Sequence, residues 1–344
     1  MYNLKQIIEK QQNLIAKTVS SSQLGISAGA NNLVVRQDLD PIVTDITQRN
    51  TPFRDIVKRE AGEGEGFTYN VYEALNSTPQ NPRNAVYGDG GLPTARAPKF
   101  GSHYHAYAPI GLQSGVTGLA QAQMRSLIDL YATEVEKTTK NVIQSEEWLN
   151  FWGSTTTLNA ASLPQYPGLD ELITTNVIDA QGGVISKTLI DRACEMIAQY
   201  GGMATHIFTS IRVGINIDNF FNQYAQVIIN QSDRDSLRLG NKVRDISTVA
   251  GVLSLSPDFF INPGNQYTLP NGQSSFPNGA PVSTVFILAM PFISMKDLQP
   301  LGMEELGRTA DKRDFFVNEY TGLKLTAEPW CAKITNVSDA IISA

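Results

Sequence analysis

The chain has 344 residues, a net charge of −6 and a pI of about 5.2. The length is enough for a sizeable core in about two domains. The acidic balance and the lack of a basic stripe argue against a protein that reads nucleic acid through its grooves. Charged residues make up 17% of the chain, below the roughly 25% usual for soluble domains. A surface largely covered by partners would explain this, as would compositional drift.

Cysteine usage and hydropathy indicate a reducing compartment and no membrane span. Cys194 and Cys331 are the only cysteines, and they lack the spacing of a metal site or a disulfide framework. The first 17 residues carry charges throughout, so they do not predict a signal peptide. No stretch approaches the length of uncharged apolar residues that a membrane helix needs.

The first 60 residues are loosely organised. Residues 3–18 place apolar side chains on one helical stripe, and the segment SSSQLGISAGANN that follows is rich in Ser, Gly and Asn. Residues 33–59 resume apolar patterning but are broken by two prolines. We interpret residues 1–60 as an arm that docks on neighbouring molecules. The stripe residues expected to make contact are Leu4, Ile7, Ile8 and Leu14.

A long hairpin is predicted next. The sequence GEGEG, Gly62–Gly66, is expected to be a flexible joint. Alternation in FTYNVYEA and in KFGSHYHAYAPIGL predicts two strands with a turn-rich tip between them, over residues 67–112. An isolated hairpin of this length cannot bury its own faces, so we expect it to lie on this chain or on another one.

Residues 119–152 predict one long helix. They contain no Gly or Pro and repeat apolar side chains at three-to-four spacing up to Gly153. The helix would have about 34 residues, or roughly 50 Å of length, and its repeat is too irregular for a coiled coil. The acidic pair Glu146 and Glu147 is interpreted as part of a solvated face or a helix end.

Mixed elements follow in residues 168–290. A helix capped by Ser186, a short strand in ATHIFTS, two strands in VRDISTVAGVLSLSPDFFI and a buried strand in VSTVFILAMP predict an α+β region. Residues 262–281 read as a loop with two Asn-Gly turns. Near the end of the chain, Leu323–Ala327 and Trp330–Ile334 alternate as two strands. Their wetter face carries Lys324, Glu328 and Lys333.

No motif predicts catalysis, a cofactor or a metal site. The sequence GISAG matches the nucleophile motif of hydrolases but lies in the arm rather than between a strand and a helix. A hydrolase that uses Ser27 therefore remains only the less favoured alternative. His103 and His105 share a strand face without a third ligand, and His206 is expected to be an interior histidine.

The order of these segments resembles the major capsid protein of tailed bacteriophages, a fold that encapsulins share. The resemblance rests on GDGGLPTARAP at the hairpin tip, on the long helix followed by PGLDEL, and on YTGLKLTAEPWCAKITNV near the end. It implies an α+β fold with an N-terminal arm at 1–60 and an extended β-hairpin loop at 61–117. It also implies a peripheral domain at 118–167 and 291–344, which contains a long spine helix and a sheet that the last strands of the chain complete. The axial domain would be residues 168–290.

The resemblance implies a structural subunit and no enzymatic activity. Such subunits self-assemble into the pentamers and hexamers of an icosahedral capsid that encloses double-stranded DNA in the virion, after assembly in the host cytoplasm. An encapsulin-type shell is the alternative, which the long arm disfavours. Some family members crosslink a loop lysine to an asparagine, but that chemistry is not carried over to Lys99 and Asn336, because no buried carboxylate base can be placed beside them.

The resemblance also implies the partners. These are neighbouring subunits and, beyond them, decoration or cement, portal and scaffolding proteins, with weak non-specific contact to packaged DNA and with no cofactor, metal or membrane. Besides the arm stripe, the residues expected at contacts between subunits are Tyr87, Asp89, Leu92, Arg96, Lys99, Tyr104, Lys324, Glu328 and Lys333.

Overall fold

The chain separates into two units, Met1–Ile46 and Thr47–Ala344. The computed structural model describes parts of the second unit, and the arm stripe, Ser27 and Arg96 lie outside the described residues. The described residues are 49–75, 87–92, 98–124, 128–155, 164–222, 244–248, 251–262, 282–308 and 310–340.

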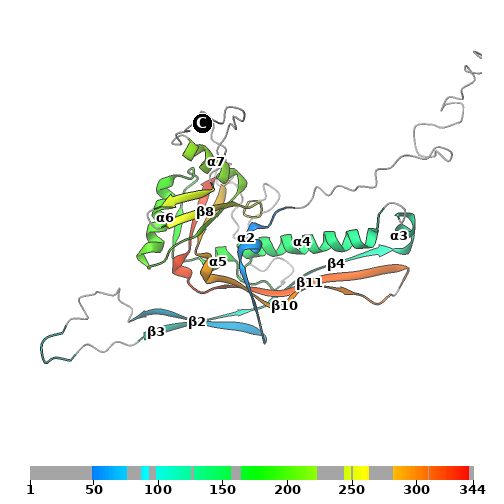
Figure 1. Cartoon of the computed structure of the whole chain (residues 1–344), viewed down its shortest axis with the longest axis horizontal. Helices are drawn as coiled ribbons and strands as arrows, with labels where there is room; N and C mark the ends of the chain where they lie inside the picture. The colour runs from blue at the N-terminus through cyan, green and yellow to red at the C-terminus, as the bar shows by residue number, and fades with distance from the viewer. Residues whose placement is uncertain are drawn as a thin grey trace, which may run out of the picture. The chain divides into compact units, whose positions relative to one another are not determined.

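A four-stranded sheet is built from segments far apart in the sequence (Figure 1). Its centre is an antiparallel pair of long strands, in which Met295 lies opposite Leu323. A short strand joins one edge in parallel, with Arg59 opposite Met295, and a ten-residue strand covers the other edge. In spatial order the strands are β1 (Lys58–Ala61), β10 (Ile293–Glu305), β11 (Lys312–Leu325) and β4 (Ala108–Thr117).

Helix α4 (Leu130–Trp152) packs against β4 and β11. The prediction of a single helix from residue 119 to residue 152 is wrong, because a separate helix α3 (Gly118–Met124) comes before it. Asp129 explains the new start: its carboxylate accepts a hydrogen bond from the N–H of Ala132, which caps α4. An N-cap residue has non-helical backbone angles, so a helix cannot run through it.

Helix α4 ends at Gly153, as predicted. The Gly153 N–H donates to the Leu149 carbonyl at 2.8 Å, and the Gly168 N–H donates to the Gly153 carbonyl at 2.7 Å. A Cβ at Gly153 would stand 2.7 Å from the Leu149 oxygen. The glycine is therefore required for close backbone approach and not for a left-handed turn, since its φ is −55°. Helix α5 (Leu169–Leu172) follows directly.

A six-stranded mixed sheet carries the second layer of the fold. Helix α6 (Lys187–Gln199) packs on this sheet. Ser186 caps α6 as predicted, because its hydroxyl oxygen accepts a hydrogen bond from the Leu189 N–H. Strand β9 (Val282–Leu288) is buried at every residue because strands flank it on both sides. The other strands, in spatial order around β9, are β5 (Val177–Asp179) and β12 (Ala332–Ser338) on one side and β6 (His206–Thr209), β8 (Gly251–Pro257) and β7 (Asp245–Thr248) on the other; the helices are α6 (Lys187–Gln199) and α7 (Ile211–Asn222).

The two terminal strands do not complete one sheet, and that expectation is wrong. β11 lies in the four-stranded sheet, whereas β12 pairs with β5 and β9 in the six-stranded sheet. A single 3-10 turn, η4 (Glu328–Trp330), leads from one sheet to the other. The expected alternation holds for Leu323 and Leu325, which are buried, but it fails at Cys331 and Ala332, which are adjacent in the sequence and both buried.

The predicted hairpin is shorter than expected. β2 (Gly66–Leu75) and β3 (Pro98–Ala106) pair as a two-stranded ribbon. The strand is interrupted at Tyr107, and the chain continues as β4 in the four-stranded sheet. Of the expected joint, residues 62–65 form a non-strand connection in which Gly64 has a φ of +76°, and Gly66 already belongs to β2.

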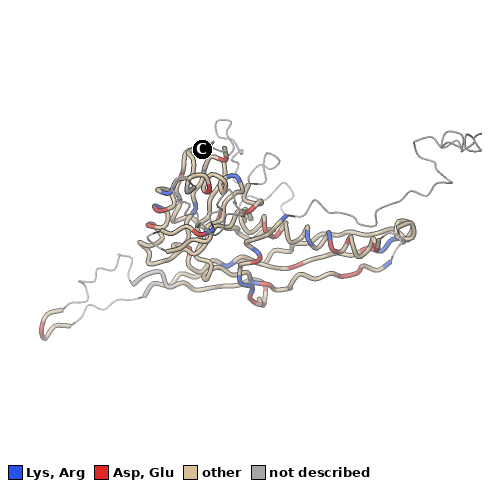
Figure 2. The backbone as a smooth tube through the Cα atoms, turned by 45° about the horizontal axis from the view of Figure 1, so that its top comes forward, with Lys and Arg blue, Asp and Glu red and all other residues tan. Residues whose placement is uncertain are grey.

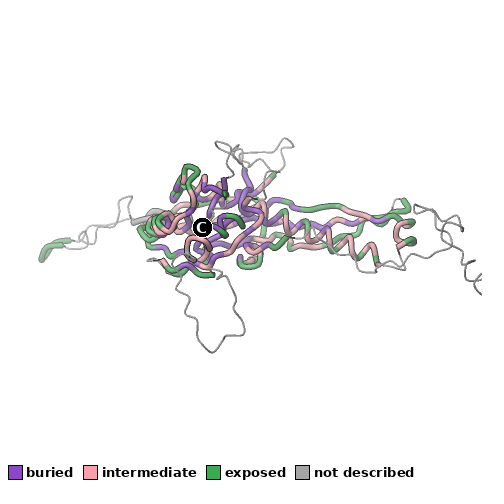
Figure 3. Tube along the Cα trace, turned by 90° about the horizontal axis from the view of Figure 1, so that it is seen from above, coloured by how far each residue is buried: buried purple, intermediate pink, exposed green. Residues whose placement is uncertain are grey.

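Two apolar cores hold the layers together. One surrounds the C-terminal part of α4, reaches both sheets and includes Phe53, Phe151 and Phe315, and the other lies between the six-stranded sheet and its helices. Trp330 packs against both. Figure 3 shows buried positions gathered around the C-terminal half of α4 and the six-stranded sheet, while the opposite end of α4 and the tip of the β10–β11 hairpin are more exposed.

Candidate functional site

The tip of the hairpin presents apolar side chains that no part of the described chain covers. The Gly91 N–H donates to the Gly88 carbonyl at 2.9 Å and closes a tight turn, in which Gly90 has a φ of +74°. On either side of this turn Tyr87 is 58% exposed and Leu92 is 93% exposed. Large apolar groups held out on a turn are typical of a surface that contacts another molecule.

The ribbon itself carries an aromatic row on one face. The rings of Tyr69 and His103 stack at 5.4 Å, and the Tyr69 hydroxyl lies 3.3 Å from Nε2 of His105. Burial, followed by repulsion from His103, lowers the pKa of His105, so this histidine is less readily charged than a free one. The expected contact residue Tyr104 lies on β3 and is 57% exposed, and the backbone of Lys99 belongs to the same strand.

A groove runs between the ribbon and the body of the protein. Its volume is about 820 Å³, and the ribbon contributes Tyr69, His103 and His105 to its wall. The opposite wall includes Phe292 and Trp330, whose rings meet edge to face at 4.4 Å. The groove is lined mainly by apolar, aromatic and neutral polar groups.

The three charged residues expected on the wetter face make contacts within their own chain. Lys324 lies 3.7 Å from the Glu60 carboxylate. Glu328 accepts from the N–H groups of Thr174 and Thr175 at 2.9 and 2.7 Å. The remaining side chain, Lys333, donates to the carboxylate of Asp170 at 2.9 Å. A contact of these residues with another subunit stays a prediction.

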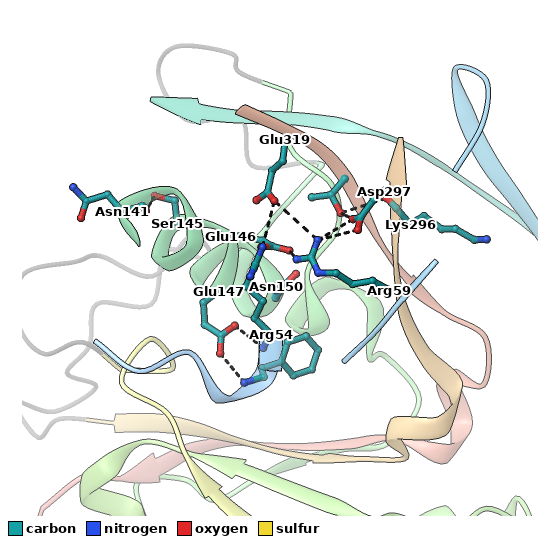
Figure 4. Close-up of polar contacts among 12 residues, drawn as sticks. Arg54, Arg59, Asn141, Ser145, Glu146, Glu147, Asn150, Lys296, Asp297 and Glu319 are labelled. Atoms are coloured by element: carbon teal, nitrogen blue, oxygen red, sulfur yellow. Dashed lines mark hydrogen bonds and ion pairs between the residues drawn. The ribbon is translucent and has the colours of Figure 1, made fainter. Parts of the chain in front are cut away.

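A buried ionic cluster is the most concentrated polar feature of the described chain (Figure 4). Glu146 and Glu147 are both fully buried, so their interpretation as a solvated face is wrong. They point from α4 toward residues Thr51–Ala61, which contain helix α2 (Pro52–Ile56) and strand β1 and which we call the strap. The strap was expected in the arm, yet Phe53 and Val57 bury it in the first core.

Two strap arginines bind carboxylates from three elements. Arg54 and Arg59 each donate to one oxygen of Glu146 on α4. Arg59 also reaches β10, where its Nη1 lies 3.0 Å from both carboxylate oxygens of Asp297. Burial alone would lower the pKa of Arg59, but the attraction of Glu146 and Asp297 outweighs it and raises that pKa. Arg59 therefore carries its full charge in this setting.

Glu147 caps the strap helix from the side of α4. Its two oxygens accept from the backbone N–H groups of Phe53 and Arg54 at 2.7 and 2.9 Å. Burial and the neighbouring carboxyl of Asp258 raise the pKa of Glu147 to about 10. Two carboxyl groups this close share one proton at neutral pH, since both cannot ionise.

Glu319 on β11 completes the cluster. Its side chain is fully buried, and its Oε2 lies 3.7 Å from Arg54 Nη2 and 4.0 Å from Arg59 Nη1. Burial, followed by repulsion from Glu146, raises the pKa of Glu319 to about 8. The sequence held no signal for this cluster, because its members come from residues 54 to 319.

Chemically, the described residues show structural pairing rather than a reactive centre. No group of three or more His, Cys, Asp or Glu in the described ranges is arranged to hold a metal ion. None of the helices described here is long and apolar enough to cross a membrane. His206 is only half-buried, with its Nδ1 2.9 Å from the Thr205 hydroxyl. Figure 2 shows acidic and basic residues interspersed along α4 and the long strands.

Comparison with known structures places the fold among capsid shell proteins. The capsid of cyanophage A-1(L) matches at a TM-score of 0.64 and 10% identity, covering 90% of this chain and 98% of that chain. A chain of Mycobacterium phage Ogopogo matches at 0.61 and 11% identity, covering 92% and 99%. The SrpI encapsulin of Synechococcus elongatus matches at 0.56 and 10% identity, covering 95% and 98%. No curated protein matches the chain by sequence.

The family follows from the sequence profile. The SU10 major capsid protein family matches residues 17–338, and the chain belongs to this family. It is therefore a structural subunit of a bacteriophage capsid shell, located in the virion, and not an enzyme. The α+β capsid fold expected from the sequence is confirmed, and the encapsulin alternative is less supported.

Proposed function

We propose that the protein builds an icosahedral shell of pentamers and hexamers around double-stranded DNA, using its hairpin loop as a main contact between subunits. The single observation that carries the loop's role is its tip, where Leu92 is 93% exposed beside a tight turn. Such exposure is costly in a free subunit and is relieved when a neighbour covers the side chain.

We further propose a division of labour within the subunit. The four-stranded sheet with α4 serves as the peripheral domain and the six-stranded sheet as the axial domain, in the sense of the family. Because β12 pairs with β5 and β9, the axial domain takes its last strand from the C-terminal segment, so its boundary differs from 168–290. The strap belongs with the peripheral domain, since β1 extends that sheet.

The other partners of the proposal follow from the shell. Neighbouring subunits are the first, and decoration or cement, portal and scaffolding proteins are the further ones. A chain with net charge −6 repels DNA at long range, so contact with packaged DNA is weak and non-specific.

The experiment expresses the full-length protein and follows assembly by light scattering and electron microscopy. Leu92→Asp introduces a charge where the contact needs an apolar group, and Leu92→Met is the matched control that keeps the apolar character. We expect closed particles with the wild-type protein and with Leu92→Met, and few or none with Leu92→Asp. Equal particle yields from both variants would contradict the role of the tip, whereas wild-type protein that stays monomeric at high concentration would contradict shell formation itself.

A further inference from the structure

The strap connects residues 1–48 to the rest of the chain, and the way it is held is unusual. Its apolar anchor is Phe53, which lies 5.3 Å from the ring of Phe151 and 5.4 Å from that of Phe208. Its polar anchors are Arg54 and Arg59, whose partners are the buried carboxylate of Glu146 and the partly buried carboxylate of Asp297. A segment held partly by buried charges responds to protons in a way that a purely apolar contact does not.

Charge counting shows that the cluster is balanced only with a proton on one carboxyl. The two strap arginines are matched by Glu146 and Asp297, which accept their hydrogen bonds. Glu319 is then a third carboxyl in the same buried place. Both of its oxygens are buried and neither has a hydrogen-bond partner within the part of the chain that the structure describes. An ionised carboxylate left in that state is costly.

The neighbours of Glu319 identify where its proton goes. Arg54 approaches it from α2, Arg59 from β1 and Glu146 from α4, and Asp297 on β10 shares Arg59 with it. Glu146 is the carboxyl placed to accept a hydrogen bond from a protonated Glu319, whereas the two guanidinium groups have no acceptor. The hydroxyl of buried Tyr166 faces the same charges and donates to Asn150, at 2.8 Å.

We propose that this cluster is a proton-dependent latch on the strap. With a proton on Glu319, its carboxyl donates to Glu146 and the two arginines are balanced by Glu146 and Asp297. When that proton is lost, a third buried negative charge faces Glu146 with no hydrogen bond of its own, and the strap loosens. The latch is a property of the subunit and does not depend on which contacts the shell uses.

The direction of the pH dependence follows from the raised pKa of Glu319, about 8 in the folded protein. Glu319 in the unfolded chain loses its proton near its ordinary pKa of 4.5. Stability that depends on the protonated form is therefore fully present below pH 4.5 and is lost as the pH rises through 8. Glu147, whose pKa is about 10, keeps its proton in this window, so Glu319 is the group that opens the latch.

Hydrogen exchange measured by mass spectrometry on the full-length protein tests the latch. The readout is the exchange of peptides covering residues 51–61 at pH 6.5, 8 and 9, in the wild type and in Glu319→Gln. The glutamine copies the shape of a protonated glutamate and cannot ionise. Comparing the two proteins at the same pH cancels the intrinsic pH dependence of exchange.

We expect the ratio of strap exchange in the wild type to that in Glu319→Gln to rise about tenfold or more between pH 6.5 and 9, with most of the rise below pH 8, because the two pKa values of Glu319 are 4.5 and about 8. Peptides from β9, which lies outside the cluster, should exchange equally in both proteins at every pH. Equal strap exchange in the two proteins at pH 9 would overturn the proposal.

A measurement on the wild type alone covers the case in which Glu319→Gln does not fold. Strap exchange, corrected for the intrinsic rate, is followed against that of β9 between pH 6.5 and 9. A rise of strap exchange relative to β9 between pH 6.5 and 8 that levels off toward pH 9 supports the latch, and a constant ratio overturns it.

Discussion

Removing Arg59 should destabilise the protein strongly, because it connects three elements through buried charges. Its Nη1 lies 3.0 Å from both oxygens of Asp297, and its Nη2 binds Glu146, which is fully buried. A unit charge pair at 3 Å is worth roughly 5 kcal/mol at an effective dielectric constant of about 20, and the cost of desolvating the pair offsets part of this. Since Arg59→Ala leaves Asp297 without its cation and buried Glu146 with Arg54 alone, we expect a loss of about 3–5 kcal/mol.

Urea unfolding of the unassembled full-length protein, at one fixed concentration, measures this loss. At a slope of about 3 kcal/mol per molar, the midpoint should fall by about 1 M or more. Arg59→Lys should recover only part of the loss, because an ammonium group cannot bind Asp297 and Glu146 at once as the two terminal nitrogens of the guanidinium do.

The double variant Arg59→Ala/Glu146→Gln provides the sharper control. If the loss comes from an uncompensated buried charge, neutralising Glu146 should restore at least about 1 kcal/mol relative to Arg59→Ala alone. A loss below about 1 kcal/mol in Arg59→Ala, or strictly additive effects of the two changes, would refute the reasoning that the cluster anchors the strap.

Three further predictions concern single positions. Phe53→Ala should lower the free energy of unfolding by about 3–5 kcal/mol because it empties a fully buried ring site, whereas Phe53→Leu should cost clearly less in the same urea titration. Ser186→Ala should lower the free energy of unfolding by about 1 kcal/mol because the helix loses its N-cap, whereas Ser186→Asp should keep the cap and the stability. Thermal unfolding of the two variants measures the difference. Hydrogen bonds from Lys296 and Lys58 lower the pKa of Glu60 to about 2. The stability due to the charged form of Glu60 is therefore present above pH 4.5 and is lost as the pH falls toward 2. In a plot of melting temperature against pH, Glu60→Gln should remove the decrease between pH 4.5 and 2.

Local patterns predicted the elements whose partners are close in sequence. The cap at Ser186, the buried strand β9 and the alternation of β2 and β3 are each visible within a dozen residues, because side-chain periodicity and capping are local. The short strands β1 and β5 and the long strand β10 were not predicted. β1 and β5 have only four and three residues, too few to establish a period, and β10 is interrupted by two register shifts.

The sequence predicted the exposed loop tip but not the ionic cluster. The tip at residues 87–92 was predicted as a contact surface, and the structure shows its side chains exposed; the contact itself stays a prediction. Glu146 was instead assigned to solvent, because adjacent acidic residues in a helix are usually exposed. Its partners Arg54 and Arg59 lie 92 and 87 residues away, so no local pattern could join them.

By itself, the sequence determined the α+β class, the order of the segments and the resemblance to a capsid subunit, since these follow from local periodicity, composition and the order of short sequence motifs. Only the tertiary structure decided which segments share a sheet and which charges are buried. The stretch that begins at Leu323 shows the reason: its strands look alike in sequence, yet η4 sends β12 into a different sheet from β11. Strand pairing and burial depend on neighbours that the whole fold brings together, and the side-chain alternation within a strand does not identify those neighbours.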